Sequence, residues 1–173
     1  MIVQANQLFE ADGTTAQNYA YWLSGRQQQQ KPLEGLHFTR QQLHIFHPVT
    51  IQEQVLAGIY ITFNTDEKSK KSQSSSSIQV LSVYEDAQVD WEVSHESQFN
   101  WTQIFISWPQ LAAITGEKIA QVQAFFRRHV SKQTGTPLQL TLTSVLSDEF
   151  NLLVDRESKQ LALVGKLYNL ILQ

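Results

Sequence analysis

The residues that could bind a metal ion are few in this chain, and their spacing does not suit a metal site. The sequence contains five histidines, namely His37, His44, His47, His95 and His129. His44 and His47 are three residues apart, which in a β-strand directs them to opposite faces, whereas the ligands of one metal ion must converge. No His-x-His pair of the kind that metal-binding cupins use is present, and the absence of cysteine excludes thiolate ligands and thiol catalysis. We therefore predict no metal and no cofactor.

The acidic residues do not form a convincing catalytic pair. Asp90 and Glu92 project from one face of a predicted strand, and Asp148 is followed directly by Glu149. A glycosidase-type carboxylate pair needs a facing sheet to close over it, and a solvated outer face is the better interpretation of Asp90 and Glu92. The sequence also lacks a Gly-x-Ser-x-Gly turn, a glycine-rich phosphate loop and a His-Glu-x-x-His helix. The chain is therefore predicted not to be an enzyme.

Aromatic residues are the better candidates for a binding site. Tyr84, Trp91 and Trp101 come from successive predicted strands and are predicted to face one interior. Buried Trp and Tyr combine a large apolar area with a polar group, which suits a ligand pocket, although simple filling of a core is the alternative. Arg40, on an early strand, is the candidate anchor for an anionic ligand.

The first half of the chain must position these residues on strands. Between Leu36 and Trp108, short runs of branched and aromatic residues are separated by polar turns, which is typical of strands. The stretch from Val89 to Val93 alternates strictly, so Trp91 shares one face with the two valines and the acids share the other. No helical segment interrupts the series, which favours an antiparallel cupin-like barrel or sandwich. The polar segment from Lys68 to Ser77 is predicted to be an exposed hairpin loop.

In the second half, apolar residues recur at spacings of three and four, which indicates helices. A short helix is predicted directly after Pro109, which suits a first helical turn, and it ends at Gly116. A second helix is predicted from Glu117 to Val130. Two longer helices are predicted over about 138–154 and 158–172. The fold class is therefore α+β, with a C-terminal helical segment after the strands.

Composition supports a single globular domain with a β half over about 35–108 and a helical half over about 109–173. Of the 173 residues, 42% are hydrophobic and only 17% charged, which excludes a disordered chain. The net charge of −3 argues against direct binding to nucleic acid, because neutralising phosphates requires a basic surface. No apolar run approaches the roughly 18 residues of a membrane span, and the N-terminus lacks the features of a signal peptide, so we expect no membrane association and a cytoplasmic location.

Two segments carry a resemblance to a known family. Residues 104–111 read Ile-Phe-Ile-Ser-Trp-Pro-Gln-Leu, and residues 156–170 read Arg-Glu-Ser-Lys-Gln-Leu-Ala-Leu-Val-Gly-Lys-Leu-Tyr-Asn-Leu. Together with the order of strands and helices, they resemble the N-terminal effector-binding and dimerisation half of AraC-type transcription regulators, in the branch of the pyochelin-responsive and similar siderophore regulators. The resemblance covers about residues 35–173 as a pattern, and it assigns no ligand residue by identity.

The resemblance implies a domain that binds a small-molecule effector, for instance a siderophore-like molecule, and relays its binding to a helix-turn-helix domain. We expect that DNA-binding domain to lie outside these 173 residues. A homodimer is also implied, and because the last predicted helix is apolar on more than one face, the contact is predicted to involve Leu163, Leu167 and Leu170. The alternatives are a protein-interaction domain without a ligand and a cupin-type enzyme.

Overall fold

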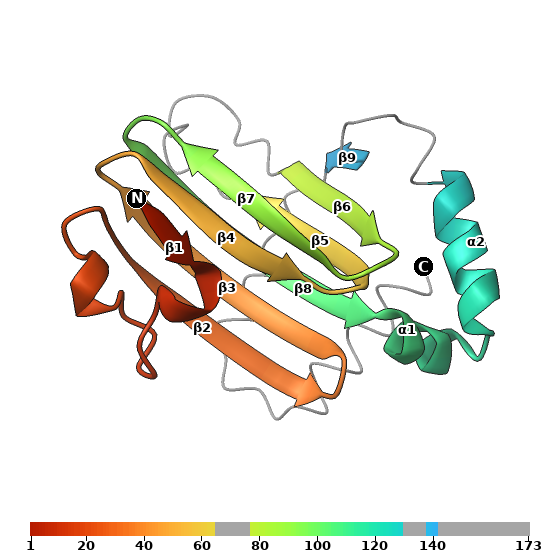
Figure 1. Ribbon diagram of the computed structural model, residues 1–173. Helices are drawn as coiled ribbons and strands as arrows, with labels where there is room; N and C mark the ends of the chain where they lie inside the picture. The colour runs from red at the N-terminus through yellow and green to blue at the C-terminus, as the bar shows by residue number, and fades with distance from the viewer. Residues whose placement is uncertain (65–76, 130–137, 142–173) are drawn as a thin grey trace.

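The protein is an open sandwich of two β-sheets followed by two helices (Figure 1). The computed structural model describes residues 1–64, 77–129 and 138–141. Its strands are β1 (Ile2–Gln4), β2 (Leu23–Leu33), β3 (Leu36–Ile45), β4 (Val49–Val55), β5 (Gly58–Asn64), β6 (Ser77–Val83), β7 (Ala87–Val93), β8 (Ser97–Ser107) and β9 (Leu138–Thr141). Two short 3-10 helices, Ala5–Gln7 and Gln17–Tyr19, precede β2. Apart from β9, the strands precede the helices, which is the α+β order predicted from the sequence.

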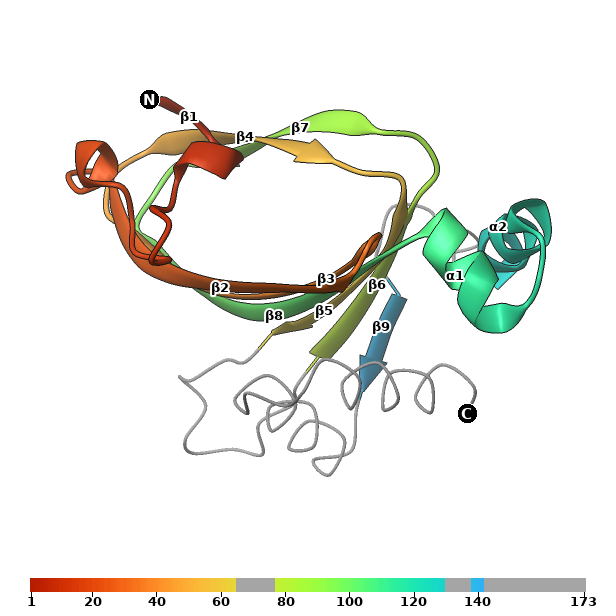
Figure 2. The same cartoon turned by 90° about the horizontal axis from the view of Figure 1, so that it is seen from below.

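The two sheets face each other as separate layers. One has six strands in the order β2-β3-β8-β5-β6-β9, and the other has three in the order β1-β4-β7. Figure 2 shows the three-stranded sheet spread over β2, β3 and β8, with the helices beyond one end of the sandwich. Among the described strands, no ladder joins one sheet to the other, so the strands do not close into a barrel.

The outer face of the six-stranded sheet carries one hydrophobic core. Because side chains alternate along a strand, Ile104 and Ile106 of β8 share this face with Phe38 of β3 and Ile59 of β5. The buried members of this cluster are Leu36, Phe38, Ile59, Phe63, Ile104, Ile106, Trp108, Leu111, Ala112, Ile114 and Val122. The cluster therefore ties the sheet to both helices.

A second core fills one end of the space between the sheets. It combines apolar side chains of β3 and β4 with residues from the N-terminal segment, namely Val3, Leu8, Ala16, Tyr19, Leu23, Leu43, Ile45, Val49 and Ile51. Further along the inner faces of the same strands lie the polar side chains of His37, Thr39 and Gln41 on β3 and of Glu53 on β4. The interior of the sandwich is thus apolar at one end and changes character along its length.

The helices begin and end where the local sequence directs. In α1 (Trp108–Thr115), the Ser107 hydroxyl accepts a hydrogen bond from the backbone N–H of Gln110 at 3.3 Å, and Pro109 lies in the first turn. Gly116 ends α1 with φ of 72°, a left-handed conformation that favours glycine. The second helix, α2, spans Ile119–His129. Both helices match the prediction, and no helix among the described residues is long and apolar enough to cross a membrane.

Other predictions were wrong or fall outside the described residues. The helix predicted from residue 138 is wrong over Leu138–Thr141, which forms β9 instead, because the edge of β6 offers backbone groups to pair with. The strands β1 and β2 were not predicted at all. The antiparallel pairing of β5 with β6 agrees with a hairpin around the Ser-rich segment, of which residues 65–76 lie outside the described part of the chain. The proposed dimer contacts Leu163, Leu167 and Leu170 also lie outside it.

Candidate ligand-binding cavity

A cavity of about 840 Å³ lies between the two sheets. Strands β2, β3, β8 and β5 form its floor, and β4 and β7 form its roof. The N-terminal segment lines one side through Gln4, Ala5, Asn6, Leu8 and Phe9. At its far end the second core, which includes Leu43 and Ile51, closes the space. This volume falls in the range of about 300–1,000 Å³ that small-molecule sites occupy.

The floor is built from amide and hydroxyl side chains in two cross-strand rows. In the first row, Gln27, Gln41 and Trp101 lie next to one another on β2, β3 and β8, and the Gln27 amide donates to the Gln41 carbonyl oxygen at 3.3 Å. The second row is Gln29, Thr39 and Gln103, with Thr62 of β5 beyond it. The Gln103 amide donates to the Thr62 hydroxyl at 3.1 Å. Each amide offers donors and an acceptor, so the floor can hydrogen-bond a polar ligand in several ways.

Aromatic rings lie on both sides of this polar floor. Trp91 of β7 and Trp101 of β8 come from opposite sheets and stack with their ring centres 6.3 Å apart. In the row beyond Gln103, the Phe105 ring is 4.8 Å from that of Tyr60 and 5.3 Å from that of His37. A ligand on the floor would therefore lie between two groups of rings.

The roof carries one inward-facing carboxylate, that of Glu53. It alternates with Gln52 and Gln54 on β4 and shares the inner face with the buried Ile51. Burial raises the pKa of Glu53 above its ordinary value, since desolvation disfavours the charged form.

The pKa values of two neighbouring titratable groups, Tyr60 and His37, are shifted as well. Burial, with a smaller contribution from the charges of Glu53 and Asp86, raises the pKa of Tyr60 to about 12, although a hydrogen bond with Leu56 opposes this shift. The Tyr60 hydroxyl donates to the Leu56 carbonyl at 3.1 Å and accepts from its N–H at 2.9 Å. Burial, and then the charge of Lys31, lowers the pKa of His37. His37 is therefore biased toward its neutral form.

The structure brings two of the four predicted ligand residues into the cavity. Trp91 and Trp101 line it, whereas Tyr84 and Arg40 do not. The prediction that Tyr84 faces the same interior was wrong: Tyr84 follows the last residue of β6, and its ring stacks on Trp108 at 5.3 Å with the Arg127 guanidinium 4.4 Å from its centre. Arg40 alternates with two cavity residues on β3 and so lies on the opposite face of the sheet.

Several cavity residues were not predicted from the sequence. They are Gln27, Gln29, Thr39, Gln41, Glu53 and Gln103. For Thr39 and Gln103 the signal is a polar side chain next to a buried apolar one on the other face of the strand, Phe38 on β3 and Ile104 on β8. Gln27, Gln29 and Glu53 have polar neighbours and carry no such signal. Such a pattern is read first as a solvated face, and only the facing sheet turns it into the lining of a cavity.

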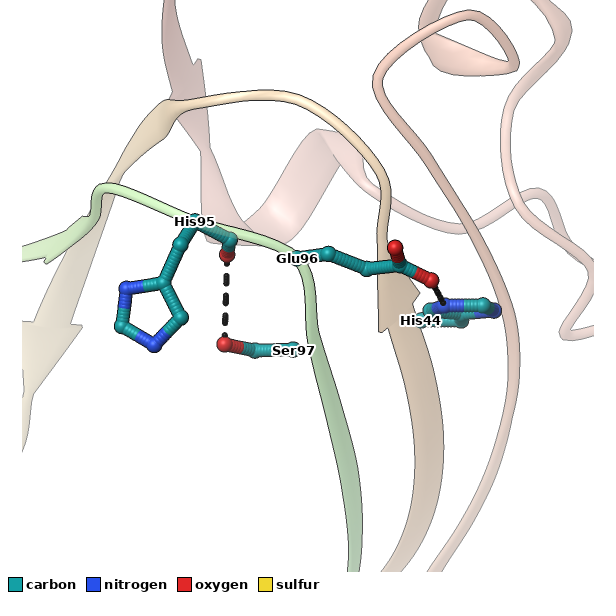
Figure 3. Close-up of polar contacts among 4 residues, drawn as sticks. All are labelled: His44, His95, Glu96 and Ser97. Atoms are coloured by element: carbon teal, nitrogen blue, oxygen red, sulfur yellow. Dashed lines mark hydrogen bonds and ion pairs between the residues drawn. The ribbon is translucent and has the colours of Figure 1, made fainter.

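His44 and His47 lie away from the cavity. The turn before β8 brings Glu96 within 2.9 Å of His44 Nε2, and the Ser97 hydroxyl donates to the His95 carbonyl (Figure 3). His47 instead stacks on Tyr21 with ring centres 4.4 Å apart. Over residues 1–64, 77–129 and 138–141, no three His, Asp or Glu side chains are grouped so that they could hold a metal ion.

No family model, curated protein or solved structure matches this chain. What the cavity binds must therefore be inferred from its own size, position and lining.

Proposed function

We propose that this chain is a ligand-sensing domain that binds a small molecule in the cavity between its two sheets. The observation that carries the proposal is the lining of the cavity, where amides and tryptophans take the place of the aliphatic residues that would fill a purely structural core. Gln41 is buried and Gln27, Thr39 and Gln103 are half-buried. Polar side chains that lose water cost stability unless they are hydrogen-bonded, so a lining of this kind is suited to a ligand that bonds to it.

The position of the cavity also suits signalling. Gln103 and Phe105 of β8 line it, and two residues after Phe105 the strand ends at Ser107, which caps α1. A ligand that prefers one placement of β8 would therefore bias the placement of α1. Such a ligand can shift the equilibrium only by its difference in affinity for the two arrangements.

We further propose that the sandwich is cupin-like and that the chain is the effector half of an AraC-type regulator. A β half followed by helices, with an interior able to take an effector, is in keeping with the resemblance described above. In this proposal the chain forms a homodimer through its C-terminal helices and contacts DNA only through a separate helix-turn-helix domain. It works without catalysis, in the cytoplasm.

The proposal predicts that a subset of small molecules raises the melting temperature. At a concentration of about 100 Kd, a ligand that binds only the folded state adds about 2.7 kcal/mol to the free energy of unfolding. For a chain of this size, that corresponds to a rise of roughly 5–10 °C. The measurement is thermal denaturation against a collection of polar metabolites and siderophore-like compounds. A collection in which no compound raises the melting temperature and none binds in equilibrium dialysis would contradict the proposal.

A further inference from the structure

We propose that the cavity selects a ligand with a protonated amine, for which the Glu53 carboxylate is the ionic partner. This inference rests on the proposed function and adds to it the chemical class of the ligand.

Glu53 is half-buried, and the described part of the protein offers its carboxylate no partner. Its side chain faces the cavity from β4, and within the described residues its carboxylate accepts no hydrogen bond and forms no ion pair. A partly desolvated carboxylate without a partner destabilises the folded state, which is why burial raises its pKa. A bound cation would supply the missing partner.

Other charges near the cavity do not fill this role. Lys31 lines the cavity from the edge strand β2, but its side chain is exposed to solvent, and His37, which also lines the cavity, is biased toward its neutral form. Asp86 also lines the cavity, and its carboxylate, which accepts the backbone N–H of Ala57 at 2.7 Å, adds a second negative charge. No arginine lines the cavity among the described residues, so it lacks the guanidinium that most often binds a ligand carboxylate or phosphate. The balance of charge therefore favours a cation over an anion.

The aromatic rings suit the same class of ligand. Trp91 is the cross-strand partner of Ile51, one inward position from Glu53, and it stacks on Trp101. Tyr60 and Phe105 lie on the other side of the floor. Aromatic faces attract ammonium groups and cover the apolar part of an organic amine. The amides of the floor would then hydrogen-bond the rest of the ligand.

The test compares three probes of similar size and different charge, namely 2-phenylethylamine, 2-phenylethanol and 3-phenylpropanoate, titrated into the full chain at neutral pH and followed by NMR. We expect the amine to bind at least about tenfold more tightly than the alcohol and the carboxylate. In Glu53→Gln, this preference should disappear through a loss of amine binding, with alcohol binding unchanged. Glu92→Gln is the matched control, because it removes the same charge from the exposed face of β7.

A stability measurement separates a binding role of Glu53 from a structural one. The folded-state pKa of this acid is raised, so its ionisation destabilises the fold, and stability is lost as the pH rises through that pKa. Glu53→Gln should therefore raise the melting temperature above that pKa while weakening amine binding. A variant that binds the amine less well and also melts earlier would point to a structural role and overturn the inference.

Three further outcomes would overturn it. Equal binding of the amine and the alcohol to the unchanged chain, or a preference that survives Glu53→Gln, would remove the role of Glu53 and leave ligand binding by the cavity standing. Failure of all three probes would also overturn the inference, and the proposed function fails with it only if the metabolite collection gives no ligand either.

Discussion

Ile104→Ala should lower the free energy of unfolding by about 2–5 kcal/mol, the usual cost of removing a large aliphatic side chain from a well-packed core. Ile104 is fully buried, with 0% of its surface exposed, on the outer face of β8. Its cross-strand neighbours are Phe38 on β3 and Ile61 on β5, and its cluster reaches both helices. The smaller side chain would leave a void where three strands and the helices depend on mutual packing. Urea denaturation followed by circular dichroism gives the value.

This variant also separates stability from binding. The Ile104 side chain lies on the face of the sheet opposite the cavity, so ligand affinity measured well below the melting temperature should stay within about twofold of that of the unchanged chain. Gln98→Ala is the control on the same strand, because Gln98 is exposed and its truncation should change stability by less than about 0.5 kcal/mol. Equal effects of the two substitutions would show that the cluster on this face is not the main core.

Thr39→Trp should lower ligand affinity at least about tenfold and leave the chain folded. Thr39 lies at the centre of the floor between Gln29 and Gln103, and it is half-buried beside an open volume of about 840 Å³. An indole at this position would occupy the space directly above the second row of the floor. Added volume is usually destabilising in a packed core, and here the indole would enter the open cavity instead. Calorimetric titration with a compound that raises the melting temperature measures the loss.

Gln42→Trp is the matched control for this substitution. Gln42 belongs to the same strand, but its exposed side chain lies on the opposite face of the sheet from the cavity. The control adds the same bulk to β3 and should bind the ligand with unchanged affinity. Unchanged affinity in Thr39→Trp, with circular dichroism confirming its fold, would mean that the ligand binds elsewhere on the molecule.

Helices and strands were predicted best from the sequence where nearby residues determine both ends of the element. The passage from β8 into α1 is specified by Ser107, Pro109 and Gly116, which act as cap, first turn and end of the helix through their own backbone preferences. The alternation from Val89 to Val93 likewise predicted a strand, and Trp91 lines the cavity, although its side chain is 43% exposed and the acids Asp90 and Glu92 are exposed as well. In these segments nearby residues contain the needed information.

The prediction failed where another part of the chain decides the structure. Strand β2 has no apolar alternation beyond Leu23, since one of its faces meets solvent and the other meets a polar cavity. Its glutamines therefore resemble a loop until β3 pairs with them. Strand β9 depends on the edge of β6, and Tyr84 depends on Trp108, which follows it by 24 positions in the chain. The inner polar rows follow from sheet register, which the sequence alone did not reveal.

The most direct test of the account uses the four tryptophans as reporters, Trp22, Trp91, Trp101 and Trp108. Their indole N–H groups give separate signals in an NMR spectrum of ¹⁵N-labelled protein, assigned with single Trp→Phe variants. Trp91 and Trp101 line the cavity, whereas Trp108 lies in the core beside α1, where its indole donates to the Val83 carbonyl at 2.8 Å. Titration with a compound that raises the melting temperature should shift the Trp91 and Trp101 signals and leave that of Trp22 in place. A titration that moves Trp22 or Trp108 and leaves both cavity tryptophans unchanged would contradict binding between the sheets.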